Sequence, residues 1–310
     1  MKNHWNSILL LMLIVAAPIQ GFAQMSTLVD VEKTFTGISR VEVSGGSLEI
    51  EYIGNQGKEI SVSAFLESTY QDQDILFVTV GDVLKISHKV NNSNRSWGNQ
   101  RTKGHIKIQG PAQMDLEMKG GSGSVRIENV ANTHTNISVG SGSVHARNIK
   151  GNLTANAGSG SLKLYDVQGD VKGRVGSGSA VIEDIKGNLD YSSGSGGVTA
   201  NRIAGVVNIT VTSGNVKVAD VAELGDLKVT SGNFNAQNAG LGPKTKISGT
   251  SGNFKIQTNS QINDFNYSLN ATSGNVTVGN SRGGKNLQIN NNSATNIRGS
   301  ITSGNISITN

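Results

Sequence analysis

Apolar and polar residues alternate in short runs along most of the chain, and many of the apolar residues are β-branched. One such stretch has apolar residues at Val144, Ala146, Ile149 and Leu153. The same spacing returns at Leu162, Leu164, Val167 and Val171, at Ala180, Ile182, Ile185 and Leu189, at Val198, Ala200, Ile203 and Val207, and at Val216, Val218 and Val221. A period of two predicts strands with one buried face, and the Gly and Asn residues between the runs predict tight corners. We therefore expect an all-β protein in which one short unit is repeated.

A Ser-Gly-Ser, Ser-Gly-Gly or Ser-Gly-Asn tripeptide marks the period of this unit. It begins at Ser122, Ser141, Ser159, Ser177, Ser195, Ser213, Ser231, Ser251, Ser273 and Ser303, in steps of 19, 18, 18, 18, 18, 18, 20, 22 and 30 residues. A βαβ unit needs roughly 30 residues and a propeller blade roughly 40, so the period fits neither. It fits one coil of a β-solenoid, and the 30-residue step is expected to contain one degenerate coil around residues 290–295.

The predicted fold is therefore an all-β, single-stranded, right-handed parallel β-helix, or β-solenoid, with about 18 residues per coil. The coils are expected over residues 121–310, continuous with an irregular, strand-rich N-terminal cap over 24–120. Alternation predicts strands around 41–43, 48–50, 60–62 and 83–86 within the cap, and the aperiodic polar stretch 91–103 predicts a mobile loop. From Ser213 onward Gly-Ser-Gly-Ser gives way to Thr-Ser-Gly-Asn, which predicts a change of cross-section or twist without a linker.

The glycine of each Ser-Gly corner is expected to have a structural role. A stacked corner needs either a positive φ or a backbone approach that a Cβ would block. The ten positions are Gly123, Gly142, Gly160, Gly178, Gly196, Gly214, Gly232, Gly252, Gly274 and Gly304. The threonines before the later corners, namely Thr212, Thr230, Thr250, Thr272 and Thr302, are expected to form a hydrogen-bonded ladder. With one such threonine per coil, the ladder is favoured over an ice-binding surface.

The first 23 residues are predicted to be a secretory signal peptide, because Lys2 and His4 precede an apolar run over 8–17 and a small-residue exit at Ala23. The run is shorter than the roughly 20 residues that span a membrane, and no comparable run follows, so no transmembrane segment is expected. Cysteine is absent, which excludes a lipoprotein, disulfides and thiolate chemistry. We expect an exported protein that is periplasmic, on the outer surface or secreted.

Neither the distribution of charged residues nor the candidate catalytic side chains indicate an enzyme. The 27 basic and 22 acidic residues are scattered and only 5% of residues are aromatic, which argues against nucleic acid as a partner. The acidic candidates for catalysis are Asp166, Asp170, Glu183, Asp184, Asp190, Asp220 and Asp226. Most recur once per coil at a corner that Asn also occupies, so we expect hydrogen bonding there rather than a catalytic pair.

The histidines His88, His105, His134 and His145 lack metal-ligand spacing, and no calcium-repeat or phosphate-loop motif is present. We predict no catalytic residue, no metal and no cofactor.

Several segments together resemble a known family. They are Phe-Thr-Gly-Ile at 35–38, the strands at 41–43 and 48–50, and Gly-Gly-Ser-Gly-Ser-Val at 120–125, which opens the repeats. With these the mature chain is similar to the bacterial family of candidate adhesins with β-strand repeats, a toastrack-like domain of unknown function common in Bacteroidetes. The resemblance implies an exported, right-handed solenoid without catalytic residues to transfer. The Thr-Ser-Gly-Asn coils depart from the usual Gly-Ser-Gly-Ser pattern.

Two functional hypotheses follow. The first is a binding or adhesion module whose laddered faces contact a glycan, an envelope component or a protein. The second is a structural or self-assembling envelope protein, or an envelope-stress sensing component, in which the edge at 303–310 pairs with another molecule. That edge could instead be protected by charge or twist, or be capped by residues folded back from 286–295. A glycan-cleaving enzyme is the least favoured hypothesis.

Overall fold

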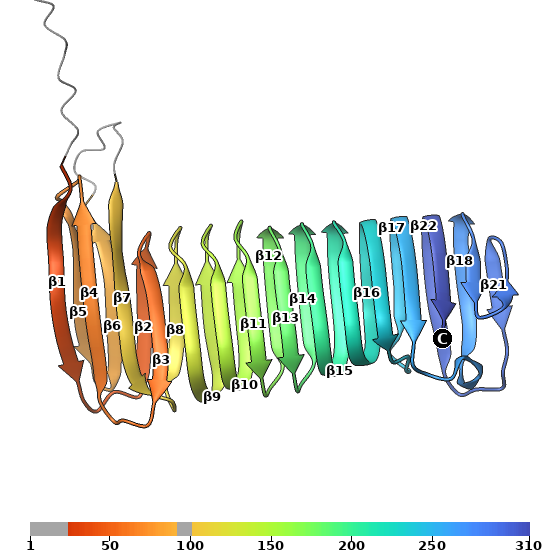
Figure 1. The fold of residues 1–310 in the computed structure, drawn as a ribbon, viewed down its shortest axis with the longest axis horizontal. Helices are drawn as coiled ribbons and strands as arrows, with labels where there is room; N and C mark the ends of the chain where they lie inside the picture. The colour runs from red at the N-terminus through yellow and green to blue at the C-terminus, as the bar shows by residue number, and fades with distance from the viewer. Residues whose placement is uncertain (1–23, 92–100) are drawn as a thin grey trace, which may run out of the picture.

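The computed structural model describes residues 24–91 and 101–310, which form one elongated rod (Figure 1). The predicted signal peptide lies outside the described residues, as does most of the predicted loop. Apart from one short 3-10 helix, η1 (Ile262–Asp264), the described elements are strands, and they join in a 22-stranded sheet. No helix of the described ranges is long and apolar enough to cross a membrane.

Each central coil contributes one strand segment to each of two faces. In β10 (Val144–Ala157), the first half pairs in parallel with β11 (Leu162–Val167) on a face that we call face A. Its second half pairs in parallel with β12 (Val171–Ser177) on the opposite face, face B. The paired residues are 18 positions apart, as between Val144 and Leu162. The structure thus confirms the predicted all-β, solenoid-like architecture, while the hand of its winding stays a prediction.

The remaining central strands are β9 (Val125–Val139), β13 (Ala180–Ile185), β14 (Leu189–Ser195), β15 (Val198–Ser213), β16 (Val216–Ala239) and β17 (Lys246–Thr258). The apolar residues that the repeat predicts to face inward lie between the two faces, each at most 2% exposed. Burial of one such aliphatic side chain contributes about 1.5–3 kcal/mol. The core is continuous along the rod because every coil buries the same positions.

Each coil turns at two different corners. At the Ser-Gly corner, a Cβ on any of the ten glycines would lie 1.6–2.0 Å from a backbone carbonyl oxygen of the neighbouring coil, so close stacking requires glycine at all of them. The opposite corner has positive φ, between 49° and 60°, at Asn129, Asn148, Asp166, Asp184, Arg202, Asp220 and Asn238. Asn and Asp tolerate this conformation better than most residues. Asp166, Asp184 and Asp220 are therefore corner residues.

The N-terminal end combines parallel coils with antiparallel strands. Parallel strands on face B are β2 (Arg40–Gly46), β6 (Val83–Val90) and β8 (Asp115–Gly120), and those on face A are β3 (Glu49–Asn55) and β7 (Thr102–Pro111). The antiparallel strands β1 (Ser26–Phe35), β4 (Ile60–Ser68) and β5 (Gln73–Val80) close this end. The solenoid thus begins before residue 120. Residues 102–103, predicted within a loop, belong to β7.

The C-terminal end departs from chain order. Its strands are β18 (Asn266–Ser273), β19 (Val276–Val278), β20 (Ser281–Arg282), β21 (Asn286–Ile289) and β22 (Asn296–Thr309). The last strand, β22, lies between β17 and the pair β18 and β19, parallel to all three (Figure 1).

The predicted degenerate coil around residues 290–295 is therefore wrong. These residues connect β21 to β22, and β20 and β21 fold back antiparallel on β19 and β18, as one of the alternatives for the cap proposed. The segment 303–310 is not an open edge, because Ile306 and Ile308 are 0% exposed and have a neighbouring strand on each side.

Candidate functional site

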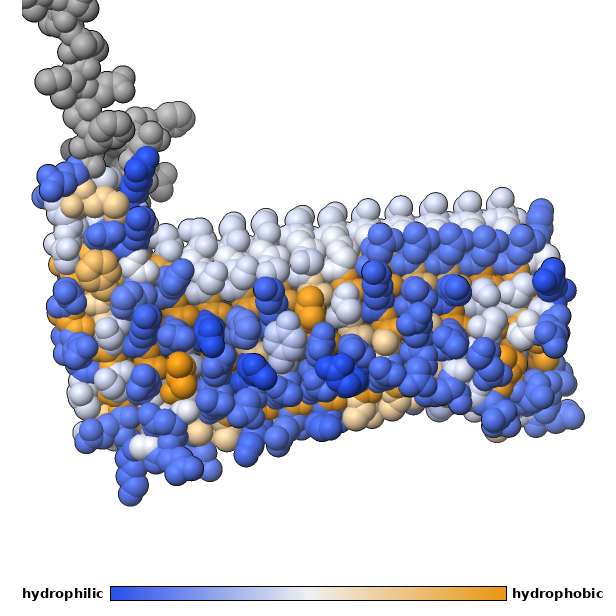
Figure 2. Space-filling model, in the orientation of Figure 1, coloured by the Kyte–Doolittle hydropathy of each residue, from blue (hydrophilic) through white to orange (hydrophobic). Residues whose placement is uncertain are grey.

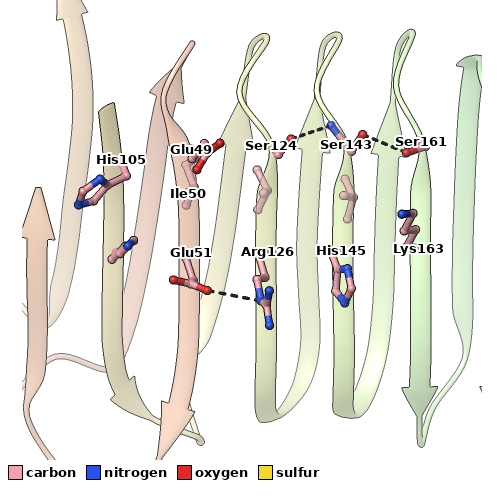
Figure 3. Close-up of a pocket in the computed structure, with 13 residues that line it drawn as sticks. Glu49, Ile50, Glu51, His105, Ser124, Arg126, Ser143, His145, Ser161 and Lys163 are labelled. Atoms are coloured by element: carbon pink, nitrogen blue, oxygen red, sulfur yellow. Dashed lines mark hydrogen bonds and ion pairs between the residues drawn. The ribbon is translucent and has the colours of Figure 1, made fainter. Parts of the chain in front are cut away.

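A groove of about 460 Å³ follows the rod axis on face A, across β7, β3, β9, β10 and β11 (Figure 3). Its position follows from the strand period, because residues two apart point out of the same face. The inward residues between them, such as Ile50, Val125 and Val144, are at most 1% exposed. The groove is thus a channel between two columns of outward side chains.

The first column is rich in hydroxyl groups. Ser161 Oγ donates to Ser143 Oγ at 2.9 Å, and the backbone N–H of Ser143 donates to Ser124 Oγ at 3.4 Å (Figure 3). Each serine follows a corner glycine, so the repeat sets their spacing. Glu49 and His105 extend the column toward the N-terminal end of the rod.

The second column is charged. Parallel register places Lys107, Glu51, Arg126, His145 and Lys163 side by side on five neighbouring strands. Arg126 is paired, with Nε 3.4 Å from Glu51 Oε1 and Nη2 2.7 Å from Glu128 Oε1. Within the described chain, Lys107 and Lys163 form no ion pair. Both ammonium groups are therefore available to an anionic ligand.

Ring pairs lie toward both ends of the groove. His105 stacks on Phe65 with centroids 5.9 Å apart, and His145 lies 5.8 Å from Tyr165 at a tilt of 47°. Burial lowers the pKa of His105, with a further decrease from Lys107, and burial likewise lowers the pKa of His145, with a further decrease from Arg126. A lowered pKa favours the neutral imidazole, and each ring presents a polar nitrogen beside an apolar face.

A second groove of about 320 Å³ lies on the same face, over β15 and β16. It separates the column that continues from Lys163 through Thr199, Lys217 and Asn235 from a column of Asn201, Ala219 and Gln237. The depression exists at Ala219 because the alanine side chain is small. The amide side chains of Asn201, Asn235 and Gln237 line this groove, so it is polar without the charged column of the first groove.

The column after the corner glycine changes from Ser to Asn in the later coils. Asn233 Nδ2 donates to Asn215 Oδ1 at 3.3 Å, and Asn253 Nδ2 donates to Asn233 Oδ1 at 3.0 Å. Figure 2 shows the change as a deep blue row along the C-terminal half of one edge, where the preceding half is paler. The predicted threonine ladder differs: the five threonines are exposed, and in the described chain no hydrogen bond joins them. Asparagine, not threonine, carries the side-chain ladder.

The acidic residues singled out from the sequence do not line either face A groove. Arg202 binds both Glu183 and Asp184, at 2.8 and 2.7 Å, and Asn208 Nδ2 donates to Asp190 Oδ1 at 2.8 Å. Further bonds involve Asp170 with Asn188, Asp220 with Asn238, Asp226 with Lys228 and Asp166 with Arg147. These carboxylates stabilise contacts between and within coils.

Two of the histidines lie at the first groove. His105 and His145, which show no metal-ligand spacing in the sequence, both line it. The 19- and 18-residue spacing of Arg126, His145 and Lys163 already aligns three of its residues. The other two histidines lie elsewhere: His88 contacts Gln73 at 2.9 Å and His134 contacts Asn136 at 3.1 Å. In the described residues, no group of three or more His, Cys, Asp or Glu side chains is placed to hold a metal ion.

The chain was compared with a family profile, with curated proteins and with solved structures. The profile of the family described as Toastrack DUF4097 matches residues 38–224 and, in a second match, 176–309. No curated protein matches the chain significantly. A structure described as a candidate lipid-binding protein from Parabacteroides distasonis is similar over 92% of this chain and 97% of its own, with 14% identity and a TM-score of 0.43. Candidate adhesins from Parabacteroides merdae and Bacteroides fragilis cover 93% and 92% of this chain and 97% of their own, with 9% and 11% identity and TM-scores of 0.31.

Proposed function

The chain belongs to the Toastrack DUF4097 family, and from the geometry of its face A we propose that it is an exported, non-catalytic binding module for a linear acidic glycan. One observation carries the proposal. The first groove combines a wall of serine hydroxyls, a wall with two lysines that form no ion pair within the described residues, and ring pairs toward both ends.

Each wall suits one part of such a ligand. The hydroxyls of Ser124, Ser143 and Ser161 can exchange hydrogen bonds with sugar hydroxyls. The ammonium groups of Lys107 and Lys163 can form charge-assisted hydrogen bonds with carboxylate or sulfate groups. The rings offer apolar faces for stacking beside polar nitrogens, as in sites where a few polar groups fix the orientation of a ligand.

The shape of the site favours a chain-like ligand. Neighbouring strands are about 4.8 Å apart, so the five strands under the first groove span roughly 19 Å along the rod. The second groove lies further along the same face, beyond β13. A polymer laid parallel to the rod axis would contact the charged groove first and the amide-lined groove after it.

Export and the direction of winding belong to the same proposal. The predicted leader supports export, since it has the three parts of a secretory signal. We infer a right-handed winding because crossovers between parallel strands of one sheet are right-handed in about 98% of cases. The second functional hypothesis, self-assembly, is supported by the non-sequential position of β22.

The test is a binding titration of the purified protein with hyaluronate and polygalacturonate, with neutral dextran as the comparison polymer. The variant Lys107→Glu/Lys163→Glu should weaken binding of at least one acidic polymer by tenfold or more. The matched control is Lys246→Glu, an exposed lysine on face B, which should bind like the parent. No saturable binding of either acidic polymer, or equal binding by the double variant, would overturn the proposal.

A further inference from the structure

The C-terminal coil occupies an interior slot of the rod. One side of β22 pairs with β17, and its other side pairs with β18 through residues up to Ser303 and with β19 from Ile306 onward. The chain therefore skips one position when it passes from β17 to β18, and fills that position only with its last residues.

The slot recognises a Thr-Ser-Gly-Asn corner in a fixed register. Asn305 Nδ2 donates to Asn253 Oδ1 at 2.9 Å, and the backbone N–H of Asn275 donates to Asn305 Oδ1 at 2.9 Å. A Cβ on Gly304 would lie 1.6 Å from the carbonyl oxygen of Gly252. Side chains and backbone of β22 are thus matched to both neighbours, and none of these contacts depends on which chain supplies the strand.

A second coil is also inserted out of order, and it provides a contrast. The strands β2 and β3 lie between β6 and β7 on one side and β8 and β9 on the other. Both ends of that coil continue into further strands of the rod. It cannot leave without unthreading those strands, whereas β22 is the last strand in chain order among the described elements.

A surface connection leads into β22. Residues 290–295 join it to β21, and they are held by the backbone N–H of Asn291, which donates to Asn266 Oδ1 at 2.8 Å, and by Asn266 Nδ2, which donates to the carbonyl oxygen of Ser293 at 2.8 Å. Fully extended, six residues reach roughly 20 Å, which is several times the spacing of about 4.8 Å between coils. Further hydrogen bonds of this connection run from Asn291 Nδ2 to the carbonyl oxygen of Phe265 at 2.8 Å and from Ser293 Oγ to that of Asp264 at 2.5 Å. When β22 is outside its slot and these bonds are open, the connection is long enough for β22 to reach a neighbouring molecule.

We propose that β22 is an exchangeable strand, and that two copies of this chain trade their C-terminal coils to form a closed dimer joined at the C-terminal ends of the rods. Before β22 inserts, β17 and the pair β18 and β19 present unpaired edges, which are templates for another strand. The strand of the same chain is favoured only by its tether, which acts as an effective concentration in the millimolar range. Reciprocal exchange satisfies both slots and closes the assembly.

A pair of cysteines reports which chain fills the slot. Ser248 and Ser300 are register partners on β17 and β22, and a separation of about 4.8 Å lies within the Cα range of disulfides. The parent chain contains no cysteine, so within one chain Ser248→Cys/Ser300→Cys can form only this bond. Within one chain the bond gives a monomer on a non-reducing denaturing gel, and across an exchange it gives a covalent dimer.

The matched control is Ser192→Cys/Thr210→Cys, which joins register partners in consecutive coils. Both variants would be refolded at concentrations from micromolar to millimolar and then oxidised. We expect the dimer band of the first variant to rise from less than a tenth to more than half of the protein, while the control stays monomeric. A first variant that closes its disulfide only within the monomer at every concentration would refute the exchange.

The parent sequence gives a second measurement that needs no engineered bond. Refolded at millimolar concentration and then diluted, it should sediment as a dimer that dissociates slowly, because dissociation requires β22 to leave a buried slot. Sedimentation as a monomer at all concentrations would also overturn the proposal. Glycan binding concerns face A near the opposite end of the rod, so either proposal can fail alone.

Discussion

Gly196 and Gly197 are adjacent in one corner, and they should respond to the same substitution in opposite ways. A Cβ at Gly196 would lie 1.6 Å from the carbonyl oxygen of Gly178, in a residue with φ of 120°. At Gly197 the nearest neighbour of a Cβ, the carbonyl oxygen of Asn215, is 3.6 Å away, which is ordinary van der Waals contact. Gly196→Ala must therefore separate two stacked coils, whereas Gly197→Ala fits.

The expected magnitude follows from two costs. A side chain forced into close-packed surroundings costs about 1–3 kcal/mol, and an unfavourable backbone conformation costs of order 1–3 kcal/mol. Gly196→Ala should thus lower the free energy of unfolding by about 4 kcal/mol. Gly197→Ala should leave it unchanged or raise it by about 0.4–1 kcal/mol, because alanine restricts the unfolded chain.

Urea unfolding followed by circular dichroism measures both variants against the parent. The comparison needs equal m-values, since a changed m-value would indicate a changed extent of unfolding. If the two variants unfold within about 0.5 kcal/mol of each other, the size of ordinary surface effects, then close stacking does not explain the recurring glycine.

Other residues give further tests. Phe234→Ala should lower the free energy of unfolding by about 3–5 kcal/mol in the same assay, because Phe234 is 1% exposed and stacks on Phe254 at 5.6 Å; a loss under about 1 kcal/mol would contradict this packing. Burial lowers the pKa of His88 from its ordinary value of 6.5, so the unfolded chain takes up the proton first and stability should fall as the pH drops below about 6.5; an unchanged acid slope of thermal unfolding in His88→Gln would refute this role. Val78→Lys, on an edge strand where Val78 is 49% exposed, should leave stability within about 0.5 kcal/mol and reduce light scattering on storage, and increased scattering would count against an aggregation-prone edge.

The repeated pattern predicts the coils well because each local signal agrees with the others. An inward position such as Val144 or Leu162 is apolar in every unit, and the 18-residue spacing between them is the register of the sheet. The Ser-Gly corner can also be predicted from the sequence, since only glycine lacks the Cβ that would clash with the neighbouring coil. The positive φ of the opposite corner is less obvious, because Asn148, Asp166 and Arg202 share no residue type.

The first groove is only partly contained in the repeat. Arg126, His145 and Lys163 fall at equivalent positions of consecutive units. Their partners Lys107 and Glu51 come from strands without the period, and the parallel pairing of β7, β3 and β9 brings them into the same column. Long-range strand pairing therefore completes a site that the spacing only begins.

The sequence by itself determined what kind of neighbour each coil accepts: a strand with the same inward apolar positions and the same glycine corner. Only the tertiary structure decided which neighbour that is. Units around Ser251, Ser273 and Ser303 carry the same Thr-Ser-Gly-Asn tetrapeptide, so local chemistry allows them to stack in more than one order. In the observed order, Ser303 lies between Ser251 and Ser273. This order depends on how the connections and the antiparallel strands β20 and β21 close the end of the rod. Their contacts involve several units at once, so no single unit of the sequence determines the order.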